Sequence, residues 1–382
     1  SYSVTGVQTC ALPIYQKAAE AGISDAQYNL GNCYYLGYGT CVDQGLAIQW
    51  FERAALQGNI SAQYNLGVAY QSGIEGKVEV EKAMYWYQYA ASQGHNQSIF
   101  NLGILLKEYS KNAEDFRKAI EWLQKSAMSG NEQAFLPLAT CFEQVIDWSN
   151  ALFWYQKAAM NGDAIALNNL GVFYDEGRGI SQDAELAFQW YHKAAELGVA
   201  ISEFNVGICY DEGKGIQQDF IKAIDFYKKA ISKEIPEASF RLGYMYQEGR
   251  GVKPDQKKAF QLYMTSAELG FFPAQGAIGE CYLFGRGIKK NPKKAIPWLV
   301  KAANQGIMTA QSHLANCYAT GLGVSKSEKD ALFWYLIALS NGSEIAQGQI
   351  EKISRHLTSC DIEEIKAKVS DWSALESERR KK

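Results

Sequence analysis

Hydrophobic residues recur along the chain at helical spacing. Residues 24–36 carry apolar side chains at intervals of four, three and one residues from Ala26, which places them on one face of an α-helix. Residues 44–56 carry alanines on both sides of the aromatic pair Trp50-Phe51, again on one helical face. No segment of the sequence shows the alternation that is typical of a strand. The pattern predicts two amphipathic helices joined by a loop.

The two-helix pattern is repeated along the chain. A Leu-Gly pair in the first helix recurs every 36 residues, with one interval of 32. We call its second residue the reference glycine and number positions in each repeat from it. The reference positions are Gly31, Gly67, Gly103, Ala139, Gly171, Gly207, Gly243, Gly279 and Ala315. The corresponding repeats 1 to 9 are 24–59, 60–95, 96–131, 132–163, 164–199, 200–235, 236–271, 272–307 and 308–343. We therefore predict an all-α fold, a right-handed α/α superhelical solenoid of nine helix-loop-helix repeats.

Glycines and short polar residues mark the ends of the predicted helices. Six loops contain Gly-x-Gly, and four residues later comes an N-cap residue. These are Asp43, Asp183, Asp219, Asp255, Asn291 and Ser327. Most second helices are followed by a glycine, which is typical of a left-handed C-terminal turn. The reference glycine costs up to about 1 kcal/mol in mid-helix relative to alanine. Its retention predicts that another helix approaches too closely for a Cβ.

Two features interrupt this regularity. Repeat 4 lacks the loop between Phe142 and Trp148, and Pro137 lies in its first helix. Proline removes a backbone hydrogen bond and tends to kink a helix. We expect a local irregularity between residues 103 and 155, and Pro297 can bend the second helix of repeat 8.

The repeated residues resemble the Sel-1-like repeat, a relative of the tetratricopeptide repeat with a slightly longer loop. The resemblance rests on Ala-Gln-Tyr-Asn-Leu-Gly-x-x-Tyr at 26–34 and Gly-Arg-Gly-Val-x-x-Asp at 249–255, and it covers 24–343. Residues 344–372 resemble the closing segment of many bacterial members, and we expect 344–382 to form capping helices and a charged tail. The resemblance implies a bacterial, non-catalytic adaptor that holds other proteins.

The first residues do not fit this scheme. Residues 1–14 resemble the translation of a sequencing adapter, and we expect them to be non-native. Residues 15–23 align with the end of a second helix, so we expect the remnant of a truncated repeat. A signal peptide with its apolar region at 7–14 is the alternative, but it lacks a positive n-region. On this interpretation the native N-terminus is missing, and a cytoplasmic, periplasmic or secreted location all remain open.

Composition excludes several classes of protein. The 382 residues are 47% hydrophobic with a net charge of −3, which argues against disorder, nucleic-acid binding and anionic membranes. The sequence contains no stretch of 18 apolar residues, which is about the length that a transmembrane helix needs. The four histidines are scattered and the Gly-x-Gly segments recur between helices, so neither predicts catalysis or a phosphate site. We expect no cofactor.

The eight cysteines also favour a structural interpretation. Five of them lie two residues after the reference position, where other repeats have Ala, Leu, Phe or Met. They are Cys33, Cys141, Cys209, Cys281 and Cys317. A position shared with such residues is a buried apolar one, so we expect reduced thiols in the core. No Cys-x-x-Cys occurs, which argues against zinc.

One polar ladder is the candidate site. Two residues before the reference position are Asn29, Asn65, Asn101, Asn169, Asn205 and Arg241, followed by His313. First helices line the concave wall of a right-handed solenoid, so these side chains can hydrogen-bond the backbone of an extended peptide. The alternative is that each asparagine bonds the neighbouring repeat. We expect a scaffold that binds a protein or peptide there, with self-association as the second hypothesis and an enzyme third.

Acidic residues near the loops alternate with basic ones. They are Asp175, Glu176, Asp211, Glu212 and Glu248, with Arg178, Lys214 and Arg250 between them. We interpret them as a solvated rim rather than a docking patch for basic partners.

Overall fold

A computed structural model describes residues 4–73 and 76–379 of the chain. The described residues form helices and connecting loops, with no β-sheet. The chain divides into two compact units, Ser1–Gln182 and Asp183–Lys382, and each is described by itself. Parts of the predicted N-terminal segment and of the charged tail, residues 1–3 and 380–382, lie outside the described residues.

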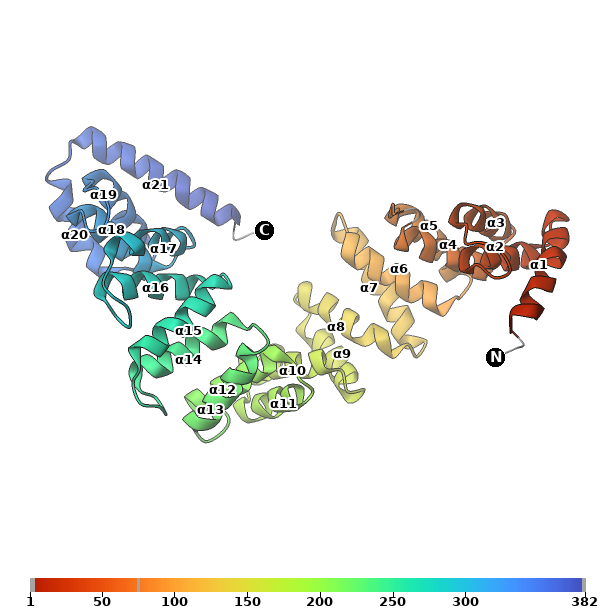
Figure 1. Ribbon diagram of the computed structural model, residues 1–382, viewed down its shortest axis with the longest axis horizontal. Coiled ribbons are helices and arrows are strands. Elements are labelled where there is room, and N and C mark those ends of the chain that lie inside the picture. The colour runs from red at the N-terminus through yellow and green to blue at the C-terminus, as the bar shows by residue number, and fades with distance from the viewer. Residues whose placement is uncertain (1–3, 74–75, 380–382) are drawn as a thin grey trace. The chain divides into compact units, whose positions relative to one another are not determined.

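The first unit contains the first four repeats and the first helix of repeat 5 (Figure 1). Its helices are α1 (Val4–Glu20), α2 (Ser24–Leu36), α3 (Gln44–Leu56), α4 (Ile60–Ser72), α5 (Val80–Ser92), α6 (Asn96–Tyr109), α7 (Ala113–Met128), the 3-10 turn η1 (Glu132–Ala134), α8 (Phe135–Gln144), α9 (Trp148–Met160) and α10 (Ala164–Glu176). Consecutive helices pack side by side, as a solenoid requires. The end of α1, from Leu12 to Ala19, packs on α2 as a second helix would.

The second unit contains the second helix of repeat 5, repeats 6 to 9 and two further helices (Figure 1). Its helices are α11 (Ala184–Glu196), α12 (Ala200–Glu212), α13 (Phe220–Ile231), α14 (Pro236–Glu248), α15 (Gln256–Glu268), α16 (Phe272–Phe284), α17 (Pro292–Asn304), α18 (Met308–Thr320), α19 (Glu328–Ser340), α20 (Glu344–Ser354) and α21 (Ser359–Arg379). The predicted all-α solenoid is thereby confirmed.

The reference glycines of repeats 1 to 3 and 6 to 8 lie under large side chains of the second helix of the same repeat. A Cβ on Gly31 would lie 2.6 Å from the Phe51 ring, and one on Gly279 would lie 2.5 Å from Leu299 Cδ2. Phe51 and Leu299 are fully buried. The close approach predicted from the glycines is therefore confirmed. The approaching group is the second residue of the aromatic pair, or a leucine in its place.

The predicted helix ends are confirmed as well. All six N-cap side chains accept a hydrogen bond from the first turn of their helix, as Asp43 does from Leu46 N at 2.8 Å. Glycines such as Gly58 follow the second helices with a φ of 88°. Repeat 6 has Glu234 in this place, at a φ of 61°. The second glycine of a Gly-x-Gly loop touches the preceding repeat, and a Cβ on Gly179 would lie 2.6 Å from Trp148 Cβ.

The irregularity expected in repeat 4 is present. Its first helix begins with the 3-10 turn η1 and continues as the short helix α8. Pro137 lies in the first turn of α8, where a missing N–H breaks no helical hydrogen bond. The shortened connection places Ile146 at a φ of 62°. In repeat 8, α17 continues as helix through Pro297.

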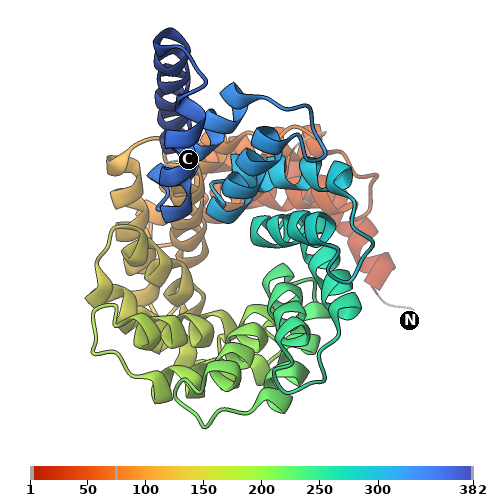
Figure 2. The same cartoon turned by 90° about the vertical axis from the view of Figure 1, so that its left-hand side faces the viewer.

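Two helices close the second unit, as predicted. The long helix α21 is the dark-blue helix that rises at the top of Figure 2, and it packs against α19. Apolar residues of α21 such as Ile365 and Trp372 cover the core of repeat 9, and the Trp372 ring lies 6.3 Å from that of Trp334. These helices therefore bury the apolar face that the last repeat would otherwise expose.

The cysteines lie where the sequence predicts. All five at the shared repeat position are buried and free, and burial raises the pKa of Cys141, Cys281 and Cys317 to about 11. The thiolate is the reactive form, so such thiols are poor nucleophiles at neutral pH. None of the described helices has the length and apolar character needed to cross a membrane.

Two glycines of α16 provide a direct test of the packing. We expect Gly279→Ala to destabilise the protein by about 1–3 kcal/mol, because its Cβ meets Leu299 at 2.5 Å. Gly276→Ala is the matched control, since its Cβ would find ordinary contacts from 3.5 Å outward. This control should stabilise the helix by up to about 1 kcal/mol. Urea unfolding followed by circular dichroism measures both, and equal shifts of the two midpoints would contradict the interpretation.

Candidate functional site

The ladder residues lie on first helices, and all six are half-buried. Asn29, Asn65, Asn101 and Asn169 belong to α2, α4, α6 and α10 of the first unit. Asn205 and Arg241 belong to α12 and α14 of the second unit. On each helix the position at −2 continues a stripe with the positions at −6, +1 and +5, because these lie three or four residues apart. We call this stripe the ladder face.

Two ladder asparagines contact tyrosines of the preceding repeat. Burial raises the pKa of Tyr87, and a hydrogen bond from Asn101 acts in the opposite direction, as expected for an amide that donates to the phenol oxygen. Asn169 bonds Tyr155 in the same way. The carbonyl oxygen of Asn101 accepts from Gln97 at 3.0 Å. Part of each amide is therefore used inside the fold.

The same tyrosines donate to a residue at +4 in their own repeat. Tyr87 Oη donates to Gln71 Oε1 at 2.7 Å, and Tyr155 Oη donates to Glu143 Oε2 at 2.5 Å. Tyr227 and Tyr263 donate to Asp211 and Gln247 at 3.3 and 3.1 Å. Each of these hydroxyls thus meets an acceptor at the end of the first helix.

Where the second helix carries no hydroxyl, the ladder residue bonds elsewhere. Repeat 1 has Phe51 in place of the tyrosine, and Asn65 donates instead to Asn32 Oδ1 of that repeat at 3.0 Å. Repeat 8 has Leu299, and His313 Nε2 lies 3.4 Å from Glu280 Oε1.

Two further ladder residues also have partners within the fold. Arg241 Nη1 lies 3.1 Å from Glu212 Oε1, and Asn205 has partners as well.

These contacts give Asn65, Asn101, Asn169 and Arg241 a structural role, which is the alternative that the sequence left open for the ladder. The signal was present in the sequence as a partly coupled choice at two positions. Repeats 2, 4, 5, 6 and 7, whose second helix has the tyrosine, carry Gln, Glu, Asp, Asp and Gln at +4, whereas repeat 9 has the tyrosine but Ala319 at +4. Repeats 1, 3 and 8, which lack it, carry Tyr35, Lys107 and Leu283. Only a comparison of these positions across the repeats reveals the coupling.

A second polar ladder, formed by buried glutamines, was not predicted from the sequence. Glutamines at −4 are buried, and their amides donate to a backbone carbonyl of the preceding second helix, eight residues earlier. Gln27, Gln63, Gln275 and Gln311 bond Ala19, Ala55, Ala267 and Ala303 at 3.0–3.3 Å. The carbonyl of Gln63 also accepts from Gln93 at 2.8 Å, at the end of its own second helix. One side chain thus joins three helices.

Repeat 6 replaces this amide pair by an ion pair. Glu203 takes the place of the buried glutamine, and Lys233 takes that of its amide partner. Lys233 Nζ lies 2.8 Å from Glu203 Oε1 and 2.8 Å from the carbonyl of Gly198. Glu203 Oε2 is buried and has no hydrogen-bond partner among the described residues. A carboxylate has no hydrogen to donate, so Glu203 cannot bond the backbone carbonyl that the glutamines bond in the other repeats.

The acidic edge is only partly the solvated rim that the sequence suggested. Glu176, Glu212 and Glu248 are exposed, but Asp211 is 1% exposed. Arg250 Nη2 lies 3.1 Å from both the carboxylate and the backbone carbonyl of Asp211. Burial raises the pKa of Asp211, and the Arg250 guanidinium opposes that shift. Asp211 therefore belongs to an internal network.

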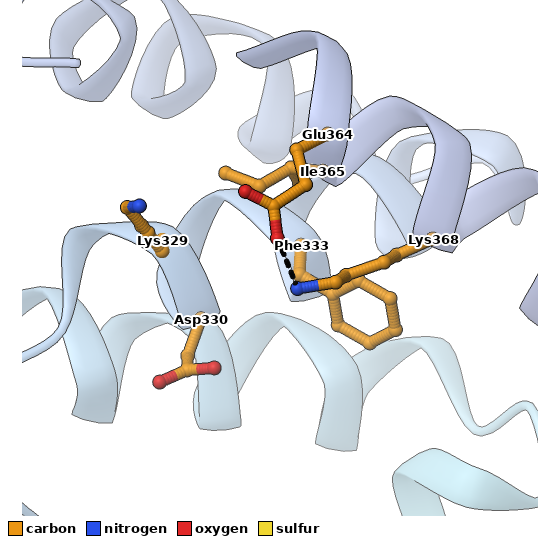
Figure 3. Close-up of a pocket in the computed structure, with 6 residues that line it drawn as sticks. All are labelled: Lys329, Asp330, Phe333, Glu364, Ile365 and Lys368. Carbon is orange, nitrogen blue, oxygen red and sulfur yellow. Dashed lines mark hydrogen bonds and ion pairs between the residues drawn. The ribbon is translucent and has the colours of Figure 1, made fainter. Parts of the chain in front are cut away.

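Elsewhere on the chain, polar side chains line hollows. No group of three potential metal ligands is found among the described residues. A hollow of about 360 Å³ on α5 is lined by Tyr85, Gln88, Tyr89 and Ser92. A second hollow, of about 200 Å³, lies between α19 and α21 (Figure 3). Its Glu364 and Lys368 pair with each other at 2.7 Å, and its Lys329 pairs with Asp361 at 2.5 Å.

Comparison with protein families gives one match that extends over most of the chain. The Sel1 repeat matches residues 24–59, 60–95, 97–131, 149–163, 164–199, 200–234, 236–271, 273–307 and 309–343. In repeat 4 the match is confined to the second helix, in agreement with the irregular first helix. No curated protein matches the chain.

The chain is similar to several solved structures. A Sel1 repeat protein from Oxalobacter formigenes is 34% identical, and the alignment covers 55% of this chain and 87% of that one, with a TM-score of 0.51. A protective antigen of uropathogenic Escherichia coli strains with an SLR fold is 26% identical over 94% of both chains, with a TM-score of 0.48. Yeast Tom70 is 13% identical over 95% of this chain and 86% of its own, with a TM-score of 0.42.

The Asp211–Arg250 pair predicts a specific pH dependence. The pKa of the Asp211 carboxyl is higher in the folded than in the unfolded protein, so folding favours its protonated form. The free energy of unfolding therefore falls as the pH rises from about 3.8, the pKa of the unfolded chain, through the pKa of the folded protein. Arg250→Met removes the largest opposing effect and extends this loss to higher pH. Near pH 3.8 we expect only the loss of the contacts of Arg250 with the Asp211 carbonyl and the Phe220 ring, and at pH 7 a further loss of about 1–3 kcal/mol, measured from urea midpoints. A similar pH dependence in an Asp211→Asn background would contradict this.

The buried glutamine ladder predicts opposite effects for two exchanges. Glu203→Gln should stabilise the protein by about 1 kcal/mol, since it restores the missing donor and can still accept from Lys233. Gln63→Glu should destabilise it by about 1–3 kcal/mol, because it buries a carboxylate with only the Gln93 amide nearby. Thermal unfolding of both variants measures this. Destabilisation by Glu203→Gln would show that the ion pair outweighs the lost hydrogen bond.

Proposed function

Since the chain belongs to the Sel1 repeat family, we propose that it is a scaffold that binds a protein partner along the ladder face of its first helices. Sel1 and tetratricopeptide-like repeat proteins are generally protein-interaction scaffolds. Each repeat contributes a stripe of the same geometry, so an extended segment can contact several repeats in turn.

Repeats 1 and 2 carry the strongest support for this proposal. Their ladder face places Asn29, Asn32 and Asn65 on neighbouring helices, and the ring below is Phe51, which has no hydroxyl to occupy an amide. Asn65 donates one N–H of its amide to Asn32. Among the described residues, the Asn65 carbonyl and the Asn32 amino group make no further hydrogen bond. They offer one acceptor and donors side by side, which matches the polar groups of a peptide backbone.

Neighbouring side chains indicate that such a partner would also present apolar residues. Leu36 lies at +5 in repeat 1 and is 50% exposed, and Val68 at +1 in repeat 2 is half-buried. Ser61 and Ser72 complete the stripe in repeat 2 without charge. Asp25 at −6 of repeat 1 is the one charged group of this stripe, and it accepts from Asn59 Nδ2 at 2.9 Å. The remaining amides and small apolar groups favour an extended segment recognised through its backbone and one or two apolar side chains.

A peptide selection tests the face directly. Linear peptides selected from a random library on the full-length protein are measured by isothermal titration against the Asn29→Ala/Asn65→Ala variant. We expect about a tenfold or greater loss of affinity, because each amide hydrogen bond contributes about 1 kcal/mol. The matched control is Gln49→Ala/Gln88→Ala, two exposed amides on second helices of the same repeats.

Three outcomes would count against the proposal. Equal losses in the test and control variants would show that the peptides bind elsewhere, as would unchanged affinity in the test variant. Recovery of no peptide that depends on Asn29 or Asn65 would have the same meaning. Concentration-dependent association that the test variant abolishes would instead assign the face to a second copy of the protein.

A further inference from the structure

The arginine in the Gly-x-Gly loop has a fixed place in two repeats. Arg178 of repeat 5 reaches back to repeat 4, where its Nη1 lies 2.6 Å from Glu143 Oε1. Its guanidinium carbon lies 5.5 Å from the centre of the Trp148 ring, at the start of the preceding second helix. Its Nε also lies 2.6 Å from Glu176 Oε2. A carboxylate at +4 of the preceding repeat, an aromatic ring and the nearby Glu176 thus hold the guanidinium, and the side chain is 29% exposed.

Arg250 of repeat 7 is held in the same way. It pairs with Asp211 at +4 of repeat 6 at 3.1 Å, and it lies 5.0 Å over the Phe220 ring at the start of α13. Its side chain is 31% exposed. Two separate repeats therefore build the same arginine site from equivalent positions.

Arg286 of repeat 8 lacks both partners. The equivalent of Asp211 is Gln247, which carries no charge, and the equivalent of Phe220 is Gln256. The guanidinium lies instead 5.3 Å over Phe284, and its Nη1 is 3.8 Å from Glu280, which is beyond hydrogen-bond distance. The side chain is 50% exposed. Where the other repeats hold the arginine, a pocket of about 270 Å³ remains, lined by Gln247, Glu248, Gln256 and Arg286.

We infer that this pocket binds a carboxylate of a protein partner, either an aspartate or glutamate side chain or the terminal carboxylate, which pairs with Arg286 beside Gln247 and supplies the charge that Glu143 and Asp211 supply in the other repeats. The planar guanidinium of Arg286 presents paired donors that match a carboxylate. Gln256 Nε2 donates one hydrogen to the backbone carbonyl of Gln247 at 3.0 Å, and its second hydrogen can be donated to the ligand.

The remaining charges decide which anion fits. Glu248 lines the pocket and accepts from Gln247 Nε2 at 2.9 Å, and Glu280 faces Arg286 from the other side. Both repel an anion, but Glu248 is exposed, so solvent and salt screen its charge. Repulsion grows with ligand charge, so a singly charged carboxylate is favoured over a doubly charged phosphate. We therefore expect millimolar affinity for an isolated carboxylate.

This site does not depend on the proposed ladder-face function, because a small molecule tests it without a protein partner. The probe is propionate, a mimic of the glutamate side chain, with propionamide as its neutral counterpart. The readout is the Nε–Hε signal of Arg286 in the arginine-labelled full-length protein, assigned by its absence in Arg286→Lys. We expect a saturable shift with propionate, a response at least tenfold weaker with propionamide, and no shift of Arg178 or Arg250.

The outcomes separate a built site from a general ionic effect. A propionate response that Arg178 and Arg250 share would overturn the inference, as would the absence of a saturable Arg286 shift. Gln247→Glu supplies the missing carboxylate internally, and it should move the Arg286 signal without ligand and weaken propionate binding at least tenfold. Gln256→Phe restores the aromatic platform and is the independent second variant. Unchanged propionate binding in both variants would also overturn the inference.

Discussion

The contact between a glycine and the large side chain above it is the constraint on which repeats 1 to 3 and 6 to 8 depend. Without a Cβ at the reference position, the first helix accepts a buried ring or leucine of the second helix directly on its backbone. That contact fixes the distance and rotation of the two helices. It also fixes where the far end of the ring points, toward the last turn of the first helix and the neighbouring repeat. The polar network follows from this placement.

A buried tyrosine hydroxyl needs partners, because an unsatisfied polar group in the core costs free energy. The fold supplies an acceptor at +4 and, in two repeats, the ladder asparagine of the next repeat. Repeats with Phe51 or Leu299 have no such hydroxyl, and their ladder contacts differ accordingly. The buried glutamines add a second set of links between repeats. Cohesion of this solenoid is therefore polar as well as hydrophobic.

Function in such a fold is best sought where one repeat departs from the others. A side chain that the network occupies in one repeat is released in another when its partner is changed. Asn65 beside Phe51 and Arg286 beside Gln247 are two such cases. Both proposals rest on this comparison among the repeats. The regular repeats supply the rigid frame, and the departures supply groups that another molecule can use.

The sequence by itself determined the helices, the caps, the core thiols and the nine repeats. These features are local or periodic, and spacing along the sequence reports them directly. The tertiary structure alone decided the partners of the polar side chains. Asp211 was expected at a solvated rim and is buried against Arg250, 39 residues away. The sequence left open whether the ladder asparagines were free or bonded the neighbouring repeat, and two of them, Asn101 and Asn169, are partly occupied by tyrosines of another repeat. Contacts between repeats depend on helix rotation and on which atom reaches which, and helical periodicity does not contain that information.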